Sequence, residues 1–508
     1  MTDFMQRGQA AIQSKNFAEA AEWFEKAVAE NPRDAQRLAC LGQTLCWLGK
    51  REEGIAQLRR AGHLLAKKAR KKRDISLLLG LTEQLQFWND YFGALELGRL
   101  AVQINSAEVR GFQLLALTYS RLNRNKEALE TAKQAVRLAP HSAMLQILAA
   151  TLEADGKQYA AAKRRLESVR GDFLKPEEKF RAHKELARVL DKLGEYDQVF
   201  GHLHAAGEVS GLLPEVKKQD PAFVPALIKT YQAGFDRDLL GRWSGTEFPG
   251  DRPPPVFLIG FLRSGTTLTQ EVVGAHPDVF VADETDLIVA VRDELNRISK
   301  AQGTMPEQLR KLDLAGVQHL RDYYWTKTRE RYGDKVGQRL LLDKTTLNTI
   351  DLGLINCIFP DAKVVFVLRD PRDVCLSCFM QTMIPNPSTV HLFTWEETAR
   401  FYALIMAWWM QIKQRMTLDF IEFRYEDAVA QFEPTYRKVF DFLALSWDPA
   451  VIGFHKRAAG RFIASPSASQ VAQPLYSSSL ARWRHYEPEF KPVADLLQPF
   501  ITAFGYEP

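Results

Sequence analysis

Cysteine is scarce in this chain, and no long apolar run occurs in it. Only five cysteines stand among 508 residues, and their odd number and spacing fit no disulfide framework. Cys375 and Cys378 form a CxxC pair, but no second pair or histidine cluster accompanies it, which argues against a zinc or redox site.

Without an apolar run of about 18 residues we expect no membrane span. The first residues lack a charged-then-apolar signal pattern, so we expect a cytoplasmic location.

Strong net charge of either sign is also absent. The formal net charge is +5, and the composition of 46% hydrophobic and 25% charged residues is ordinary for a globular protein. A mild positive balance suits an anionic small ligand and does not indicate a nucleic-acid partner. The chain is too long for one ordinary hydrophobic core, so we expect two or more domains.

The first half of the chain contains an internal repeat. Small residues stand in pairs 12 positions apart, and successive pairs begin 34, 40, 34, 34 and 37 residues apart: Gly8/Ala20, Gly42/Gly54, Thr82/Ala94, Ala116/Ala128, Ala150/Ala162 and Ala187/Val199. Small residues are needed where two antiparallel helices cross closely, and a period near 34 is that of tetratricopeptide repeats. We predict an all-α solenoid of about six helix pairs over residues 1–211. Its concave face is expected to bind a protein partner.

The 40-residue step accommodates a basic run, Lys67 to Arg73. A solvated helix extension or loop fits this run, and so does a patch for an anion or a partner. Beyond the repeats, residues 212–252 are predicted to form a helical linker that ends at a proline-rich boundary.

From residue 253 to residue 508 the pattern predicts an α/β domain. Short apolar runs end in polar residues and alternate with longer helical segments: VFLIG (256–260), LLLDK (340–344), KVVFVLRD (363–370) and DFIEFRYED (419–427). This pattern is typical of a parallel sheet with helices on both faces. Ligands of such sheets bind beyond the carboxyl ends of the strands, where these polar residues converge.

The loop FLRSGTT follows the first of these runs. Gly260 and Gly265 stand five apart, as in a phosphate loop, and Gly265 lets backbone N–H groups turn toward an anion. The positive end of the following helix would add to this attraction. Thr266 occupies the position where a Walker loop has lysine, so we expect no magnesium-assisted triphosphate chemistry and no bound metal. Arg263 becomes the cation of the loop.

Two segments resemble the nucleotide signatures of sulfotransferases that use 3′-phosphoadenosine 5′-phosphosulfate (PAPS). The loop is similar to the family's 5′-phosphosulfate loop, and LRDPRDVCLSCF is similar to its 3′-phosphate segment. The resemblance implies that PAPS is the co-substrate, that adenosine 3′,5′-bisphosphate is the product and that no metal is used. The donor contacts that it implies are Arg263, Ser264, Gly265, Thr266, Thr267, Arg369, Ser377 and Tyr425 of RYED, with Ser479 and Arg482 as candidates in a C-terminal segment that resembles a closing loop.

The tyrosylprotein sulfotransferase branch, and bacterial proteins that fuse tetratricopeptides to a sulfotransferase, are the most similar. In that branch the base is a glutamate 21 residues after the loop arginine, which implies Glu284. The lysine at the bridging oxygen lies 15 residues before an FP pair, which implies Lys344. The sequence departs from the pattern at Leu262, where the family often has proline. Asp286 and Ala290 stand where that branch has arginines that recognise the peptide.

Several alternatives remain open at the sequence level. The acceptor hydroxyl could belong to a protein tyrosine, a saccharide or a small phenol, and the repeats favour a polypeptide. Asp283 competes with Glu284 as the base. A kinase-like phosphotransferase would need magnesium and ATP. A repeat scaffold whose α/β domain binds nucleotide without turnover would lack a working base and lysine.

Overall fold

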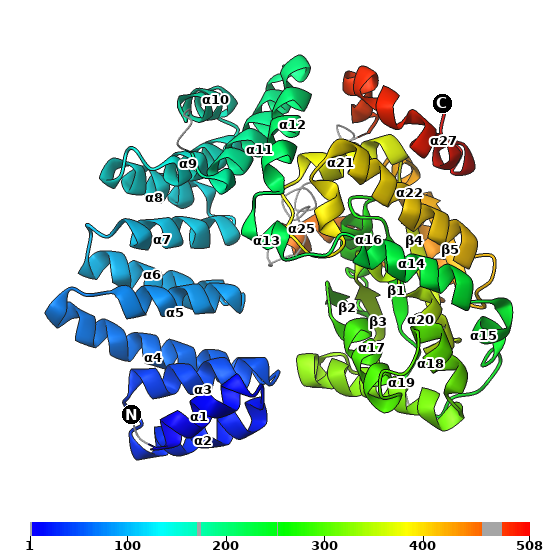
Figure 1. Cartoon of the computed structure of the whole chain (residues 1–508), viewed down its shortest axis with the longest axis horizontal. Coiled ribbons are helices and arrows are strands. Elements are labelled where there is room, and N and C mark those ends of the chain that lie inside the picture. Colours follow the sequence, from blue (N-terminus) through cyan, green and yellow to red (C-terminus); the bar gives the residue numbers. More distant parts are fainter. Residues whose placement is uncertain (1–2, 170–173, 251, 460–479, 508) are drawn as a thin grey trace. The chain divides into compact units, whose positions relative to one another are not determined.

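The structure is a computed structural model that describes residues 3–169, 174–250, 252–459 and 480–507 (Figure 1). The chain divides into two compact units, Met1–Glu178 and Lys179–Pro508. The boundary falls inside the first turn of a helix, Pro176–Leu193, which the repeat period assigns to the sixth pair. Most of that helix and all of the next one, Tyr196–Ser210, therefore belong to the second unit. The second unit begins at Lys179, whereas the sequence predicts the end of the repeats at Gly211.

The first unit is helical, and its helices pack in consecutive pairs (Figure 1). They are α1 (Asp3–Gln13), α2 (Phe17–Glu30), α3 (Ala35–Trp47), α4 (Arg51–Lys72), α5 (Ser76–Phe87), α6 (Tyr91–Ile104), α7 (Val109–Arg121), α8 (Asn125–Leu138), α9 (Ala143–Asp155) and α10 (Tyr159–Ser168). Side-chain oxygens cap several of these helices. Asp34 accepts the N–H groups of Gln36 and Arg37, and Asp90 accepts that of Gly93.

The small residues of the repeat lie where the paired helices cross. A Cβ built at Gly42 of α3 would stand 2.7 Å from the carbonyl oxygen of Gly54 of α4, so neither helix could approach as closely with a side chain there. All of the paired small residues, from Gly8 to Val199, are buried. The predicted helix-pair solenoid is confirmed.

The basic run continues α4 instead of forming a loop. The helix reaches Lys72, and Arg73 ends it in a left-handed conformation with φ of 53°. Lys67, Lys68, Arg70 and Lys71 are exposed. The 40-residue step in the repeat therefore corresponds to a solvated extension of helix α4.

The second unit is built on a parallel five-stranded sheet. Its strands are β1 (Val256–Gly260), β2 (Val279–Asp283), β3 (Leu340–Lys344), β4 (Lys363–Leu368) and β5 (Asp419–Arg424), in the order β2-β3-β1-β4-β5. The predicted parallel sheet is confirmed, and four of the strands are the four apolar runs. The edge strand β2 was not expected, although its sequence VFVAD is as apolar as that of β3; three of its five residues are only partly buried.

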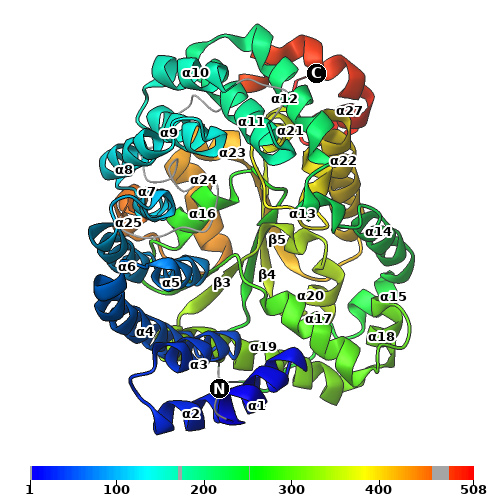
Figure 2. The same cartoon turned by 60° about the vertical axis from the view of Figure 1, so that its left-hand side comes forward.

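Helices cover both faces of this sheet (Figure 2). Those of the second unit are α11 (Pro176–Leu193), α12 (Tyr196–Ser210), α13 (Pro214–Lys217), α14 (Phe223–Gly234), α15 (Arg237–Gly241), α16 (Thr266–Val273), α17 (Leu287–Ile298), α18 (Met305–Lys311), α19 (Leu314–Tyr332), α20 (Leu352–Ile358), α21 (Pro371–Met380), α22 (Trp395–Ile412), α23 (Tyr425–Ala430), α24 (Phe432–Phe442), α25 (Phe454–Ala459) and α27 (Ala494–Ala503), with a 3₁₀ segment η5 (Arg482–Val493). Over the described parts of the chain, no helix combines the length and apolarity that crossing a bilayer requires.

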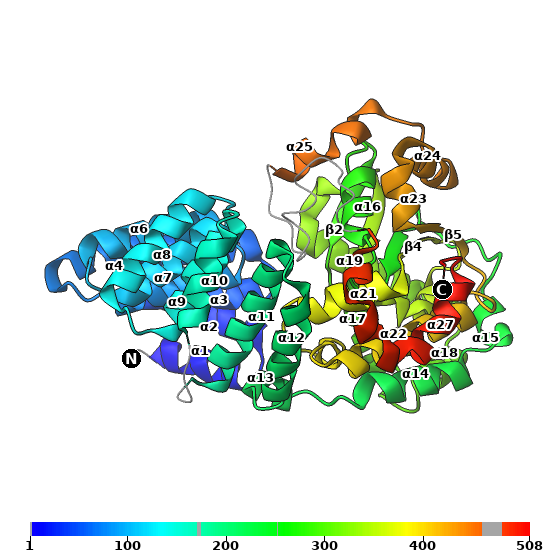
Figure 3. The same ribbon diagram turned by 90° about the horizontal axis from the view of Figure 1, so that it is seen from above.

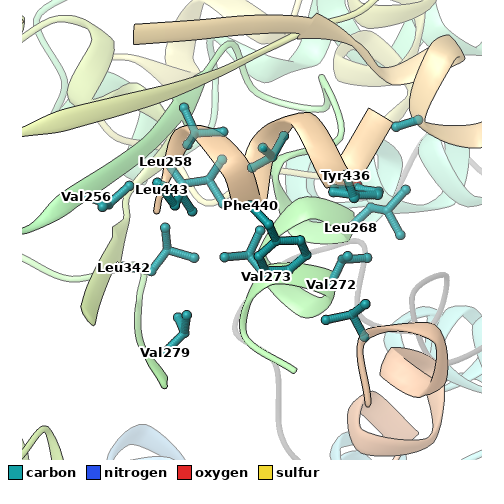
Figure 4. Packing of buried hydrophobic residues seen from close by; sticks show 14 of the residues in the cluster. Val256, Leu258, Leu268, Val272, Val273, Val279, Leu342, Tyr436, Phe440 and Leu443 are labelled. Carbon is teal, nitrogen blue, oxygen red and sulfur yellow. The ribbon is translucent and has the colours of Figure 1, made fainter. Parts of the chain in front are cut away.

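Alternate strand residues feed two separate cores. Val256 and Leu258 of β1 pack with α16 and α24 in the buried cluster of Figure 4. Phe366 of β4 points to the opposite face and stacks on Trp409 of α22, with ring centroids 3.8 Å apart. Burial of both faces fixes the register of the strands. Their carboxyl ends are therefore held at one edge, with Asp283 beside Lys344 and Gly260 beside Val367.

Candidate functional site

The phosphate loop, residues 261–265, connects β1 to α16. Gly265 has φ of 107°, and a Cβ at this position would overlap the ring of Tyr425. The glycine thus allows both the turn and the close approach of that ring. Thr266 and Thr267 are buried in the first turn of α16. The amino end of this helix favours an anion because its first N–H groups have no intrahelical acceptor.

The side chain of Ser264 is an orphan within this loop. It is 2% exposed, and its Oγ has no hydrogen-bond partner among the described residues. A buried hydroxyl without a partner is energetically unfavourable, by about 1–3 kcal/mol. Thr266 differs, because its Oγ1 lies 3.0 Å from Oγ1 of Thr346. An anionic oxygen bound in this loop could accept a hydrogen bond from the Ser264 hydroxyl.

A second candidate anion site, here called the second cradle, lies at the end of β4 and contacts the phosphate loop, which is the first cradle. Arg369 follows the strand and is 8% exposed, and its Nη1 donates to the carbonyl oxygen of Arg263 at 3.2 Å. The Nε of Arg263 donates to Oγ of Ser377 on α21 at 3.0 Å. The guanidinium carbon of Arg369 stands 5.0 Å from the ring centroid of Tyr425. Four residues predicted from separate motifs are therefore brought together in one place.

Glu426 and two residues near the C-terminus stabilise the loop that follows β4. The Asp370 N–H donates to Oε1 of Glu426 at 3.0 Å, and the Tyr506 hydroxyl donates to Oε2 of the same carboxylate at 2.7 Å. Arg372 donates to the carbonyl oxygen of Glu507 at 2.7 Å. Burial raises the pKa of Glu426. The loop that carries Arg369 is thus tied to the end of β5 and to the chain terminus.

Lys344 and Glu284 meet at the ends of the neighbouring strands β3 and β2. Lys344 is 1% exposed, and its Nζ donates to Oε1 of Glu284 and lies 3.5 Å from Oδ1 of Asp283. The Glu284 side chain keeps 35% of its surface exposed, so an acceptor can reach it. The pair joins a buried cation to an accessible carboxylate. Asp283 is close enough to share the cation.

Both loop residues with the largest predicted roles have left-handed backbones. Arg263 has φ of 67° and Glu284 has φ of 45°. A residue with a Cβ adopts this conformation at a cost of about 1–2 kcal/mol, and the surrounding contacts must hold it there. The Glu284 N–H donates to the carbonyl oxygen of Lys344 at 2.8 Å, which fixes the carboxylate next to the lysine.

Thr285 and Thr345, which follow Glu284 and Lys344, are joined by hydrogen bonds that the sequence did not predict. The Thr285 N–H donates to Oγ1 of Thr345 at 3.0 Å, and that hydroxyl donates to the Thr285 carbonyl oxygen at 3.0 Å. The hydroxyl of Thr285 and that of Tyr324 both donate to the carboxylate of Asp343, at 3.3 and 2.9 Å. Threonine after each predicted residue was the only available signal, and it means little until β2 and β3 are known to be neighbours.

We expect Asp343 to lower stability as pH rises, and the variant Asp343→Asn to remove that effect. Burial raises the pKa of Asp343 from 3.8 to about 6, so the folded state holds the proton between these values and the unfolded state does not. The protonated side chain therefore contributes about 2–3 kcal/mol to the free energy of unfolding below about pH 4. This contribution is lost as the pH rises through about 6. Urea titrations of both proteins at pH 4 and pH 7 measure it. A gap between the two proteins that is equal at both pH values would contradict the assignment.

The two C-terminal candidates lie differently. Ser479 falls outside the described residues. The guanidinium of Arg482 is engaged by the carboxylate of Asp191, with Nε 2.9 Å and Nη2 2.6 Å from Oδ1. The described residues bring Arg482 to α11 and not to the phosphate loop.

The cysteines form no disulfide, and no cluster of metal-ligating side chains accompanies this site among the residues that the structure describes. All five thiols are free, and Cys375 and Cys378 are buried. Over the described residues, no group of three or more His, Cys, Asp or Glu side chains could hold a metal ion.

Residues 254–449 match the family model described as Sulfotransferase family. Residues 3–34 and 109–142 match models described as Tetratricopeptide repeat. Separate segments of the chain are therefore similar to sulfotransferases and to tetratricopeptide repeats. The sulfotransferase match contains both anion cradles, Glu284 and Lys344.

The relatives that match this chain are distant. An uncharacterized protein of Aquifex aeolicus is 26% identical over 80% of this chain, and the chain spans about half of that protein, 52%. Protein-tyrosine sulfotransferase A of Caenorhabditis elegans is 25% identical over 50% of this chain and 68% of its own length. Among solved structures, the sulfotransferase domain from the curacin biosynthetic pathway aligns with a TM-score of 0.35 and 18% identity, over 51% of this chain and 99% of that one.

Proposed function

We propose that this protein transfers a sulfuryl group from PAPS to a hydroxyl acceptor. The supporting observation is the direct link between the two anion cradles, from Arg263 to Ser377 and from Arg369 to the Arg263 carbonyl. Two cradles that share one arginine suit a ligand with two separate anionic groups, as in an adenine nucleotide with a 5′-phosphosulfate and a 3′-phosphate. The match of this segment to the sulfotransferase family model supports the same ligand.

The donor contacts divide between the cradles. Arg263, Ser264, Gly265, Thr266 and Thr267 would hold the 5′-phosphosulfate, and Arg369 and Ser377 would hold the 3′-phosphate. Tyr425, whose ring lies against Gly265 and under the Arg369 guanidinium, would border the adenosine. The unsatisfied hydroxyl of Ser264 would find its acceptor in a phosphosulfate oxygen.

The transfer would proceed in line at sulfur. The acceptor oxygen forms a bond to sulfur as the bond from sulfur to the bridging oxygen breaks, and adenosine 3′,5′-bisphosphate leaves. Glu284 takes the acceptor proton as general base. Lys344 and Arg263 stabilise the negative charge that develops on the bridging and leaving oxygens. In the free enzyme Lys344 contacts Glu284, and we propose that the donor's bridging oxygen draws the ammonium away and frees the carboxylate.

The acceptor is proposed to be a polypeptide, with tyrosine as its reactive residue. Relatives named protein-tyrosine sulfotransferases support this choice, as do the repeats, whose concave face would dock a protein partner. Two residues after Glu284, Asp286 pairs with Arg331 at 2.6 Å, at a position where the tyrosylprotein branch has an arginine. We further propose the cytoplasm as the compartment, on the sparse cysteine usage.

The function is tested by calorimetry of adenosine 3′,5′-bisphosphate with the wild type and with Arg369→Ala. We expect the wild type to bind without added metal. The variant should lose about 10- to 100-fold in affinity, because a charge-assisted contact to a phosphate contributes about 1.5–3 kcal/mol. Equal binding by both proteins, or no binding by the wild type, would contradict the proposal.

Two further assays separate this function from its rivals. A phosphotransferase would bind ATP with magnesium and would label an acceptor from γ-labelled ATP. A scaffold without turnover would bind the bisphosphate but transfer no label from sulfur-labelled PAPS to any component of a lysate. We expect label transfer from PAPS alone.

A further inference from the structure

Lys184 of helix α11 contacts α21, the helix that carries Ser377. Lys184 is 1% exposed, and its Nζ donates to the carbonyl oxygen of Phe379 in the last turn of α21. Carbonyl groups in a last turn have no intrahelical donor, and a cation is favourable there. The ammonium also lies 4.8 Å from the Phe379 ring centroid. Burial lowers the pKa of Lys184 to about 7, so this contact is made at an energetic cost that the fold tolerates.

Three consecutive residues of α21 connect α11 to the phosphate loop. Ser377 accepts a hydrogen bond from Arg263, the Cys378 thiol donates to the Leu262 carbonyl oxygen at 3.4 Å, and Phe379 accepts from Lys184. The last turn of α21 therefore lies between the phosphate loop on one side and α11 on the other.

Asp191 supports the same helix from a second point. It follows Lys184 by seven residues, two helical turns, and so lies on the same face of α11. Its carboxylate is 5% exposed and accepts from Arg482 and, at 2.7 Å, from the Tyr486 hydroxyl. Both partners belong to η5, which runs beside α12 and α21 (Figure 3).

Segment η5 then reaches the first turns of α21. The Trp483 N–H donates to Oδ1 of Asp373 at 2.9 Å, and Oδ2 of Asp373 lies 3.6 Å from Nη2 of Arg369. The Arg372 guanidinium stacks over the Trp483 ring at 3.7 Å. A chain of contacts thus leads from Asp191 through Arg482 and Trp483 to the arginine of the second cradle.

We propose that α11, which the repeat period assigns to the tetratricopeptide array, is a working part of the 3′-phosphate half-site. Lys184 and Asp191 are positioning residues that hold the two ends of α21, and with them Ser377 and Arg369. This inference rests on the proposed function, because it presumes a nucleotide with a 3′-phosphate. It places the start of the functional sulfotransferase unit near Lys179, well before residue 253.

The test compares two nucleotides on the full-length protein. Adenosine 3′,5′-bisphosphate and adenosine 5′-monophosphate differ only in the 3′-phosphate, so their affinity ratio reports on that half-site. Asp191→Asn keeps the size of the side chain and removes its charge. We expect the bisphosphate to bind about tenfold more weakly and the monophosphate to change less than about twofold, as for a coupling carried by adjacent contacts.

Two milder variants and a matched control guard against a folding defect. Tyr486→Phe removes one hydroxyl from Asp191, and Lys184→Met keeps the buried volume but removes the donor to Phe379. Each should lower the bisphosphate-to-monophosphate ratio about threefold or more. The control is Glu153→Gln, which breaks a similarly buried carboxylate–arginine pair with Arg165 in the first unit and should leave the ratio unchanged.

The outcomes separate the inference from the function beneath it. If the wild type shows no preference for the 3′-phosphate, the proposed function fails. If the wild type has the preference and the α11 variants keep it, the inference is wrong while the function stands. Equal weakening of both nucleotides would also overturn the inference, since it would indicate a general structural role.

Discussion

Glu284→Gln should lower kcat for sulfuryl transfer by about 10²–10⁴-fold, because a positioned general base contributes this much. Glutamine fills the same space and still accepts a hydrogen bond from Lys344, which donates to Oε1 of the native carboxylate. Nucleotide affinity should change less than about threefold, since the anion cradles are separate from this side chain. Initial rates with sulfur-labelled PAPS and calorimetry of adenosine 3′,5′-bisphosphate provide the two measurements.

Asp283→Asn is the matched control for the base. Asp283 precedes Glu284 and also approaches Lys344, at 3.5 Å. Its loss should lower kcat much less than the loss of Glu284. A large fall in kcat for Asp283→Asn with a small one for Glu284→Gln would transfer the role of base to Asp283.

Lys344→Met should lower kcat and kcat/KM together by about 10²–10³-fold, the range for removing one donor that stabilises developing charge. Lys344 is 1% exposed, so methionine keeps most of the buried volume while it removes the ammonium. Lys344→Arg retains the charge, but its planar fork does not reproduce a compact ammonium in a buried site. We therefore expect only partial activity from it.

Acceptors of different pKa separate a role of Lys344 at the donor from a role in support of Glu284. Because Lys344 is proposed to act on the bridging oxygen, the deficit of Lys344→Met should persist with every acceptor, including phenols of low pKa that need little help from a base. A deficit that disappears with such phenols would place Lys344 in support of Glu284 and not at the donor.

Much of this architecture could be predicted from the sequence because it depends on local patterns. The repeat shows itself by small residues at a fixed period, and their burial at helix crossings follows directly. Four strands are readable as apolar runs, and Gly265 requires a turn wherever it lies. The order and spacing of Arg263, Glu284, Lys344, Arg369 and Ser377 are likewise properties of the linear chain.

Other features depend on which segments become neighbours. Strand β2 was not predicted, and it lies at the edge of the sheet, where three of its five residues are only partly buried. Asp343 and Thr285 look ordinary until β2 and β3 pair and bring Glu284 to Lys344. The periodic pattern extends to Val199 and gives no hint that α11 and α12 pack with the second unit.

The sequence by itself therefore determined the two kinds of domain and the positions of the candidate phosphate loop and candidate reactive side chains, because periodicity, apolar runs and glycine act over a few residues. Only the tertiary structure decided that Arg263 bonds Ser377, that Glu284 contacts a buried lysine and that α11 contacts the last turn of α21. These contacts join residues tens to hundreds of positions apart. Strand order and helix packing bring such residues together, and neither can be read from local sequence.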